Sequence, residues 1–375
     1  MNFVVSSTDL LNHLQAIAKV ISSKNTLPIL DNFLFELKSN VLTITASDLE
    51  TTLVTSMEVE NAEGEGVIAV DARRLLKLKD TSEQPLTFNI NTETLSVDIL
   101  SESGKFSKVE QKGDDFPQPH EVDETKKTEI ALPAEALLTA INKTIFATAD
   151  DDLRPVMNGI LFTFSADYMT AVASDAHKMV RYRRTDITSE QESSFILPQK
   201  PAQLLKNLLP NDESEVKIVF DHQNAIIEFA NFVQVCRLVE GKYPNYDAVI
   251  PKDNPYRMTV DRLDIYNKLK MVSGYANPAS NLVKMSIAPN ELKVSAQDLD
   301  FSMSAFERLK CEYEGEEMEI GFKGVFLLEI IANISSTDVF VELSDPSRAA
   351  LFLPVEKDDD NEDLLMLIMP MMVNQ

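Results

Sequence analysis

The stretch "NFLFELKSNVLTITASDLETTL", residues 32–53, decides the fold because related stretches follow it twice in the chain. The second is "NGILFTFSADYMTAVASDAHKMV", residues 158–180, and the third is "NLVKMSIAPNELKVSAQDLDFSM", residues 281–303. Each has two apolar runs around a short turn that contains Asn or Asp. Alternation with a period of two residues, as in Leu42 and Ile44, is typical of half-buried β-strands. We therefore predict one β-hairpin that occurs three times.

Equivalent Asp residues close the three hairpins in A-S-D or A-Q-D. They are Asp48, Asp175 and Asp298, at separations of 127 and 123 residues. Apolar residues at helical spacing precede each hairpin from Asp9, Glu135 and Asp261, and follow each one from Asp71, Lys200 and Lys323. The sequence thus predicts three similar α+β domains, each with helices and strands in the same order.

Composition agrees with a folded protein of several domains. The 375 residues are 44% hydrophobic and 25% charged, and this length suits about two or three domains. The N-terminal residues lack a basic segment followed by a long apolar run, so we expect a cytoplasmic protein with no membrane partner. Cys236 and Cys311 show no metal-ligand spacing, and we expect both to be buried and free.

The formal charge of −25 argues at first against a nucleic-acid partner. The six predicted helical segments, however, carry 13 basic and 7 acidic residues, so the rest of the chain is strongly acidic. If the helices share a face, this charge separation can guide an anionic polymer to it. Helix propensity and snorkelling of lysine are the alternative explanation.

No sequence signature of common catalysis or metal binding occurs. The chain lacks Walker A, HExxH, GxSxG and GxGxxG motifs. His177 follows Asp175 by two residues, but it has no partnered nucleophile in the sequence. The run "DDDNED", residues 358–363, lacks the Gly and Glu of a calcium loop, so we interpret it as a solvated acidic loop. We expect no catalytic residue, no metal and no cofactor.

The chain ends with an acidic run and then the uncharged stretch "LLMLIMPMMV", residues 364–373, which contains four Met residues. Leu365 and Ile368 fit a closing core strand, in which alternation sends half of the residues inward. Flexible, polarizable Met side chains suit a surface that receives varied partners.

Seven stretches together resemble the bacterial sliding clamp family, the beta subunit of the replicative DNA polymerase. They are "NTLPILDNFLFEL", "LTITASDLE", "RPVMNGILF", "VASDAHKMV", "RLVEGKYPNYDAVIP", "YEGEEMEIGF" and "IMPMMV". The resemblance spans essentially the whole chain. It implies the clamp fold, with three α+β domains at residues 1–122, 127–250 and 251–375. Two chains would form a head-to-tail homodimeric ring with helices lining the hole and sheets outside.

The resemblance further implies a non-catalytic processivity factor that encircles double-stranded DNA without sequence preference. Its partners would be the replicative DNA polymerase catalytic subunit, the clamp loader, repair polymerases and other proteins with a clamp-binding motif. A ring that holds DNA topologically needs only a weakly positive lining, which reconciles the net charge with DNA. The candidate DNA-facing residues are Lys19, Lys24, Lys77, Lys200, Lys206, Lys268 and Lys270.

By the same resemblance, the Met-rich tail forms one wall of a hydrophobic pocket for partner peptides. The implied lining is Met157, Ser174, Ala176, His177, Lys178, Met179, Pro244, Val249, Leu367, Met369, Pro370 and Met371. The chain departs from the family pattern at Ala176, Lys178, Ala248 and Met372, which leaves the preferred peptide open. The implied dimer interface consists of Arg74, Phe106, Lys108, Met271 and Val272.

Two hypotheses of other classes stay open at this point. One is an enzyme with Asp175 and His177 in a cleft between repeats. The other is an acidic scaffold that binds peptides and never touches DNA.

Overall fold

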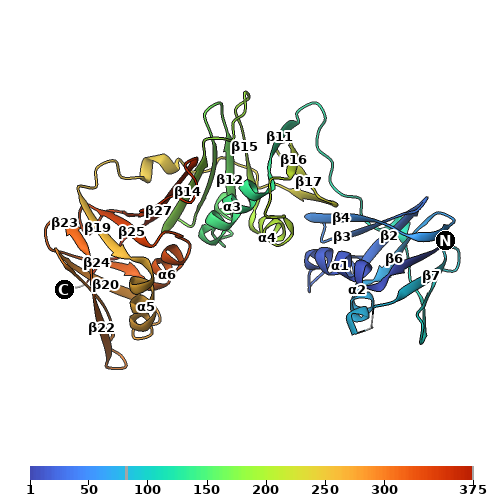
Figure 1. The fold of residues 1–375 in the computed structure, drawn as a ribbon, viewed down its shortest axis with the longest axis horizontal. Helices are drawn as coiled ribbons and strands as arrows, with labels where there is room; N and C mark the ends of the chain where they lie inside the picture. Colours follow the sequence, from blue (N-terminus) through green and yellow to red (C-terminus); the bar gives the residue numbers. More distant parts are fainter. Residues whose placement is uncertain (81–82, 374–375) are drawn as a thin grey trace. The chain divides into compact units, whose positions relative to one another are not determined.

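The computed structural model describes residues 1–80 and 83–373, and it contains four antiparallel β-sheets with six α-helices (Figure 1). The chain divides into two compact units, residues 1–138 with 203–238 and residues 139–202 with 239–375. The division runs through helices α3 and α4. None of the helices in the described residues has the length and apolar character needed to cross a bilayer.

The first unit holds one five-stranded and one nine-stranded sheet. In sheet order, the smaller has β5 (Glu60–Glu63), β1 (Asn2–Ser6), β7 (Pro85–Asn91), β8 (Ser96–Leu100) and β9 (Lys105–Val109). The larger has β10 (Gln111–Lys112), β6 (Gly66–Asp71), β2 (Asn32–Lys38), β3 (Val41–Ser47), β4 (Thr51–Glu58), β18 (Phe232–Arg237), β17 (Asn224–Phe229), β16 (Glu215–Phe220) and β11 (Thr128–Pro133). The β4–β18 pair makes one sheet from strands of the first and second repeats.

The second unit holds one nine-stranded and one four-stranded sheet. The larger has β15 (Ser193–Pro198), β12 (Gly159–Phe164), β13 (Met169–Ser174), β14 (Lys178–Arg184), β27 (Glu362–Ile368), β26 (Ala350–Pro354), β25 (Asp338–Leu343), β19 (Tyr256–Asp261) and β23 (Glu312–Glu314). The smaller has β22 (Met303–Lys310), β21 (Glu291–Asp298), β20 (Leu282–Ala288) and β24 (Met318–Lys323). Here β14 and β27 join the second and third repeats.

Helices flank each hairpin in the order that the repeat predicts. They are α1 (Ser7–Ile17), α2 (Ala72–Leu75), α3 (Ala134–Thr144), α4 (Gln199–Leu208), α5 (Arg262–Ser273) and α6 (Gly324–Ala332). Short 3-10 helices cover Ala18–Val20, Pro28–Asp31, Leu76–Asp80, Gly113–Asp115, Ile145–Ala147, Pro155–Met157 and Tyr246–Val249. Side-chain caps start α1, α2 and α5, where Ser6, Asp71 and Asp261 accept backbone N–H bonds. The helix predicted over 71–80 is therefore one α-helical turn followed by a 3-10 helix.

The hairpins of the first two repeats turn in the same way. Asp48 Oδ1 accepts the N–H groups of Glu50 at 3.1 Å and Thr51 at 2.7 Å, and the residue after Asp48 has a φ of 78°. Asp175 Oδ1 accepts those of His177 at 2.9 Å and Lys178 at 2.8 Å. Asp298 differs, because it is fully buried and bonds to the N–H of Asp300. All three Asp residues thus accept the N–H two residues on, the hydrogen bond of an Asx turn, and the first two also accept the N–H three residues on.

Strand β27 is buried on both faces, which corrects the expected alternation. Leu364, Leu365, Met366, Leu367 and Ile368 are all buried. Leu365 and Leu367 belong to an apolar cluster that also includes Tyr243, and the side chains of Val239, Tyr246 and Ile250 pack against that cluster. The segment 239–250 therefore covers one face of this strand, and covered strands carry continuous apolar runs.

Candidate functional site

The chain's C-terminal tail forms one wall of a small pocket. Strand β27 pairs with β14 so that Leu367 lies opposite Met179 and Ile368 opposite Lys178. Beyond the strand, the N–H of Met369 donates to His177 O at 2.8 Å, and the N–H of Met371 donates to Gly321 O at 2.8 Å. The tail therefore crosses from the start of β14 to β24.

Gly321 permits this crossing. A Cβ atom at Gly321 would lie 3.0 Å from the carbonyl oxygen of Met371 and 2.7 Å from a methyl group of Val373. Any other residue would push the tail away from β24. The position of the tail thus depends on a close backbone approach.

The pocket between the tail and α6 has a volume of about 230 Å³. Its lining is His177, Ala279, Ser280, Lys323, Phe326, Met369, Pro370 and Met371. The His177 ring stacks on Phe326 with centroids 6.2 Å apart. A small apolar pocket with few polar groups suits one or two side chains of a partner, because pockets for small molecules are larger, at roughly 300 to 1,000 Å³.

Four residues of this pocket were predicted, and four were not. His177, Met369, Pro370 and Met371 lie together as expected. Phe326 and Lys323 escaped prediction because the segment from Lys323 reads as an ordinary core-facing helix. Ala279 and Ser280 carry no signal of their own in the sequence.

The other residues predicted for the pocket lie outside its lining. Met157, Met179 and Leu367 are buried, and the last two belong to the apolar cluster beside segment 239–250. Pro244 and Val249 are exposed on that segment. Ser174 is engaged in the turn, because its Oγ donates to Lys178 O at 2.9 Å and accepts the Ala176 N–H at 3.1 Å. Ala176 is exposed beside it. As pocket residues, these seven stay predictions.

Lys178 lies buried beneath the pocket. Its Nζ is 2.6 Å from Glu329 Oε2 and 3.4 Å from Asp175 Oδ2. The same ammonium lies 4.4 Å from the centroid of Phe326, a distance that gives a cation–π contact. Two carboxylates thus balance this buried charge.

The geometry gives no support to catalysis by Asp175 and His177. Asp175 uses Oδ1 for two backbone N–H groups and Oδ2 for Lys178. The His177 ring stacks on Phe326 instead of facing a nucleophile. In the described part of the chain, no group of three His, Cys, Asp or Glu residues is arranged to hold a metal ion.

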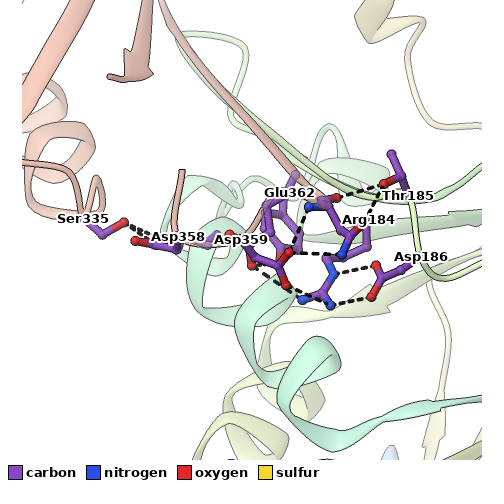
Figure 2. Close-up of polar contacts among 10 residues, drawn as sticks. Arg184, Thr185, Asp186, Ser335, Asp358, Asp359 and Glu362 are labelled. Atoms are coloured by element: carbon purple, nitrogen blue, oxygen red, sulfur yellow. Dashed lines mark hydrogen bonds and ion pairs between the residues drawn. The ribbon is translucent and has the colours of Figure 1, made fainter. Parts of the chain in front are cut away.

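Four acidic residues of the run 358–363 form ion pairs, Asp358, Asp359, Glu362 and Asp363, and the last two lie in β27, so the interpretation of the run as a solvated loop is wrong for them. Arg184 Nη2 lies 2.6 Å from Asp186 Oδ2 and 3.5 Å from Asp359 Oδ2, and its Nη1 lies 3.6 Å from Glu362 Oε1 (Figure 2). Asp358 accepts a hydrogen bond from Ser335 and lies 3.4 Å from Lys143 Nζ. These contacts tie the start of β27 to the end of β14.

Six of the seven lysines expected at DNA are solvent-exposed: Lys19, Lys24, Lys77, Lys200, Lys206 and Lys270. Lys268 is half-buried, and its Nζ lies 3.0 Å from Glu307 Oε2 of β22. The hydrogen bond to Glu307 raises the pKa of Lys268. The carboxylate balances its charge, so Lys268 is the weakest of the seven candidates.

The residues predicted for the dimer interface differ in exposure. Phe106 on β9 is 54% exposed and Met271 on α5 is 63% exposed. Val272 is a correction, because its side chain is fully buried and cannot face a partner. On a helix, adjacent residues point about 100° apart, so the exposure of Met271 places Val272 toward the core.

The two predicted basic interface residues already have acidic neighbours in the chain. Lys108 Nζ lies 3.1 Å from both Asp71 Oδ2 and Glu110 Oε2, and Arg74 Nε lies 3.5 Å from Asp71 Oδ2. Burial raises the pKa of Asp71, but hydrogen bonds from Lys108 and Arg74 outweigh burial and lower it. Arg74, Phe106 and Lys108 also line a cavity of about 590 Å³ beside β9.

Three domains of like topology, with an apolar pocket at the C-terminal tail, define a three-domain clamp fold. Residues 1–120, 131–245 and 247–372 match, in turn, the N-terminal, central and C-terminal domains of the DNA polymerase III beta subunit. The chain belongs to the DNA polymerase III beta subunit family, the bacterial beta sliding clamps.

Individual relatives match along their whole length. The beta sliding clamp of Pseudomonas aeruginosa is 28% identical over 99% of this chain and 100% of the relative. That of Vibrio cholerae is 27% identical over 99% of both. A crystal structure of the Pseudomonas aeruginosa subunit covers 100% of both chains with a TM-score of 0.92 and 26% identity. A Pseudomonas aeruginosa clamp bound to griselimycin matches with the same TM-score, identity and coverage.

Proposed function

We propose that this chain is a sliding clamp, a non-catalytic ring of two copies that encircles double-stranded DNA and holds a replicative polymerase to it. The observation that carries the proposal is the full-length match to beta sliding clamps in sequence and fold. The clamp loader, repair polymerases and other motif-bearing proteins would dock on the same ring. Such a protein would act in the cytoplasm, in association with DNA.

Two sheet edges support assembly into a dimer. Strand β9 ends the five-stranded sheet, and β22 ends the four-stranded sheet. Both carry exposed apolar side chains, Phe106 and Val109 on β9 and Met303 and Phe306 on β22. Unpaired edge strands with such side chains invite pairing with another chain. In the proposed ring, β9 of one copy pairs with β22 of the other, with Met271 beside Phe106.

The exposed lysines support a DNA-facing surface without tight binding. Lys19 and Lys24 follow α1, Lys77 follows α2, Lys200 and Lys206 lie on α4, and Lys270 lies on α5. Each phosphate contact strengthens binding and makes it more sensitive to salt. A topological link needs few such contacts, and the acidic remainder of the chain repels DNA elsewhere.

The pocket at the tail supports docking of short peptides from partners. Three Met residues at 369, 371 and 372 follow β27, and two of them line the pocket with His177 and Phe326. Met side chains repack at little cost around different partner side chains. One pocket can therefore serve several partner proteins in turn.

Retention on DNA tests the proposal. The protein is loaded onto nicked circular DNA by its host's clamp loader, washed with high salt, and the circle is then cut with a restriction enzyme. We expect the protein to stay on circles through the wash and to leave when ends are opened. Loss from circles and linear DNA alike would contradict the ring and favour a scaffold that binds only peptides.

Charge reversal at Lys24, Lys200 and Lys206 separates DNA contact from peptide docking. If these lysines face DNA, the triple Glu variant should load poorly while binding partner peptides normally. Reversal of Lys252, an exposed lysine outside the predicted DNA set, serves as the control. Equal loading of both variants would remove these lysines from the DNA-facing surface.

A further inference from the structure

The tail pocket contains a lysine whose charge is not balanced. Lys323 Nζ lies 4.7 Å from the centroid of Phe326, in the pocket lining. Lys178 lies 4.4 Å from the same ring but is balanced by Glu329 and Asp175. Across residues 1–80 and 83–373, Lys323 forms no ion pair. The chain has 60 acidic and 35 basic residues. Acidic partners are therefore plentiful, and a lysine that lies beside a pocket without one is available to pair with a ligand.

The rest of the pocket has no negative charge to offer. Its lining contains Lys323 and His177 but no Asp or Glu. Helix α6 begins at Gly324, and Lys323 is its N-cap residue, with no side-chain hydrogen bond to the cap. The positive end of this nine-residue helix therefore adds to the positive potential beside Lys323.

We propose that Lys323 makes this pocket selective for peptides in which an Asp or Glu side chain stands beside apolar side chains. The inference rests on the proposed function, because it assigns the chemistry of a partner to the peptide pocket. The apolar side chains would contact Phe326, Met369 and Met371, and the carboxylate would accept a hydrogen bond from the Lys323 ammonium. A charge-assisted bond of this kind is about twice as strong as a neutral one.

The size of the pocket favours a peptide side chain over a free anionic metabolite. A volume of about 230 Å³ is below the roughly 300 to 1,000 Å³ typical of small-molecule sites. A single lysine also gives no bidentate fork for a phosphate group, which arginine would supply. A carboxylate on a peptide gains affinity from its apolar neighbours, which a free anion lacks.

Matched peptides test the proposal. A set of six-residue peptides of Leu, Phe and Ser is acetylated and amidated, so that the ends carry no charge. Each position in turn is replaced by Glu in one peptide and by Gln in its matched partner. Fluorescence anisotropy measures the Kd of each pair on the full chain, on Lys323→Met and on the control Lys252→Met. Met retains the apolar stem that packs on Phe326 and removes only the charge.

At one position or more, we expect Glu to bind about three- to tenfold more tightly than Gln on the unaltered chain. The ratio should fall to about one on Lys323→Met, stay unchanged on Lys252→Met, and shrink as salt increases.

Three results would overturn the proposal. The first is equal binding of the Glu and Gln peptides at every position, which overturns the role of Lys323. If Met369→Ala still abolishes binding in that case, the peptide pocket itself is retained. A Glu preference that survives Lys323→Met assigns recognition to another base. Failure of every peptide to bind overturns the peptide pocket of the proposed function and this inference with it.

Discussion

Ala176 carries backbone strain at the turn beside the pocket. Its φ is 74°, in the left-handed region, where an L-residue costs roughly 1–2 kcal/mol. Glycine removes this cost but loses roughly 0.5–1 kcal/mol through the entropy of the unfolded chain. We therefore expect Ala176→Gly to raise the free energy of unfolding by up to about 1 kcal/mol, measured by urea denaturation.

Ala131→Gly provides the matched control for this change. Ala131 is exposed like Ala176 but lies in strand β11, opposite Lys217. Glycine there brings only the entropic cost, so the free energy of unfolding should fall. If both substitutions destabilise the chain to the same extent, the strain at Ala176 is absent.

Met369 and Met372 differ in their relation to the pocket. Met369 is 40% exposed and lines the pocket, whereas Met372 is 85% exposed and lies outside the lining. Truncation of a side chain buried by a partner typically costs about 1–3 kcal/mol. We expect Met369→Ala to weaken binding of a partner peptide by that amount in calorimetry. Met372→Ala, the same change three residues on, should alter it by less than about 0.3 kcal/mol.

The two ends of the β14–β27 pair have different roles, with the pocket at one end and an ionic cluster at the other. Lys178 and Ile368 lie opposite each other at the pocket end, while Arg184 and Glu362 lie opposite each other at the other end. Arg184 is largely buried and contacts three carboxylates there. Because a slip by one residue would turn the strand over, the ionic cluster at one end helps to fix the register that places the tail at the other.

Removal of Arg184 should destabilise the second unit strongly. Arg184→Met leaves Glu362, whose side chain is only 11% exposed, without its cation, and loss of one partner from a buried pair costs about 3–5 kcal/mol. We expect the free energy of unfolding to fall by about 3 kcal/mol in urea denaturation. Asp186→Asn should cost less than about 1 kcal/mol, because Asp186 is more exposed. Equal losses would contradict the central role of Arg184.

The effect of Asp186 should depend on pH in a defined direction. The hydrogen bond from Arg184 lowers the pKa of Asp186 below its ordinary value of 3.8. A carboxyl group whose pKa is lower in the folded state than in the unfolded state stabilises the fold. This contribution is complete above the unfolded-state pKa and is lost as pH falls through the folded-state pKa. The difference in unfolding free energy between the unaltered chain and Asp186→Asn should therefore be constant above about pH 5 and shrink progressively as pH falls below 3.8, toward the lowered pKa of the folded state. A difference that grows on acidification would contradict this pairing.

Local patterns in the sequence predict the elements well, and contacts between distant residues escape them. The hairpin of residues 32–53 and its two counterparts form strands as expected, since alternation and turn residues are encoded locally. The burial of both faces of β27 depends on segment 239–250, more than 100 residues away in the chain. Lys178 likewise meets Glu329 across 151 residues. Phe326 was not predicted as a pocket residue, because helical spacing does not reveal which side chain at the end of a helix is left uncovered by its neighbours.

At the scale of the whole molecule, charge and apolar surface have separate roles in the proposed ring. The predicted DNA-facing lysines lie on or just after helices, whereas the exposed apolar residues Phe106, Met303 and Phe306 lie on edge strands. Attraction between the lysines and DNA phosphates is screened by salt beyond about 10 Å. Association of the two copies, in contrast, depends on burial of apolar surface. DNA affinity should thus fall with salt while the dimer persists.

The interface itself gives the last prediction. Phe106 and Met271 are both more than half exposed in one chain, and buried apolar anchors dominate the energy of interfaces. We expect Phe106→Ala with Met271→Ala to weaken the dimer by about 4 kcal/mol, nearly a thousandfold in Kd. Light scattering should then give the 42.0 kDa mass of one chain. Leu153→Ala, which truncates a side chain 91% exposed and outside both edges, should leave the dimer intact. A double variant that keeps the dimer mass at micromolar concentration would place the interface elsewhere, because a loss of 4 kcal/mol would turn even a nanomolar Kd into a micromolar one.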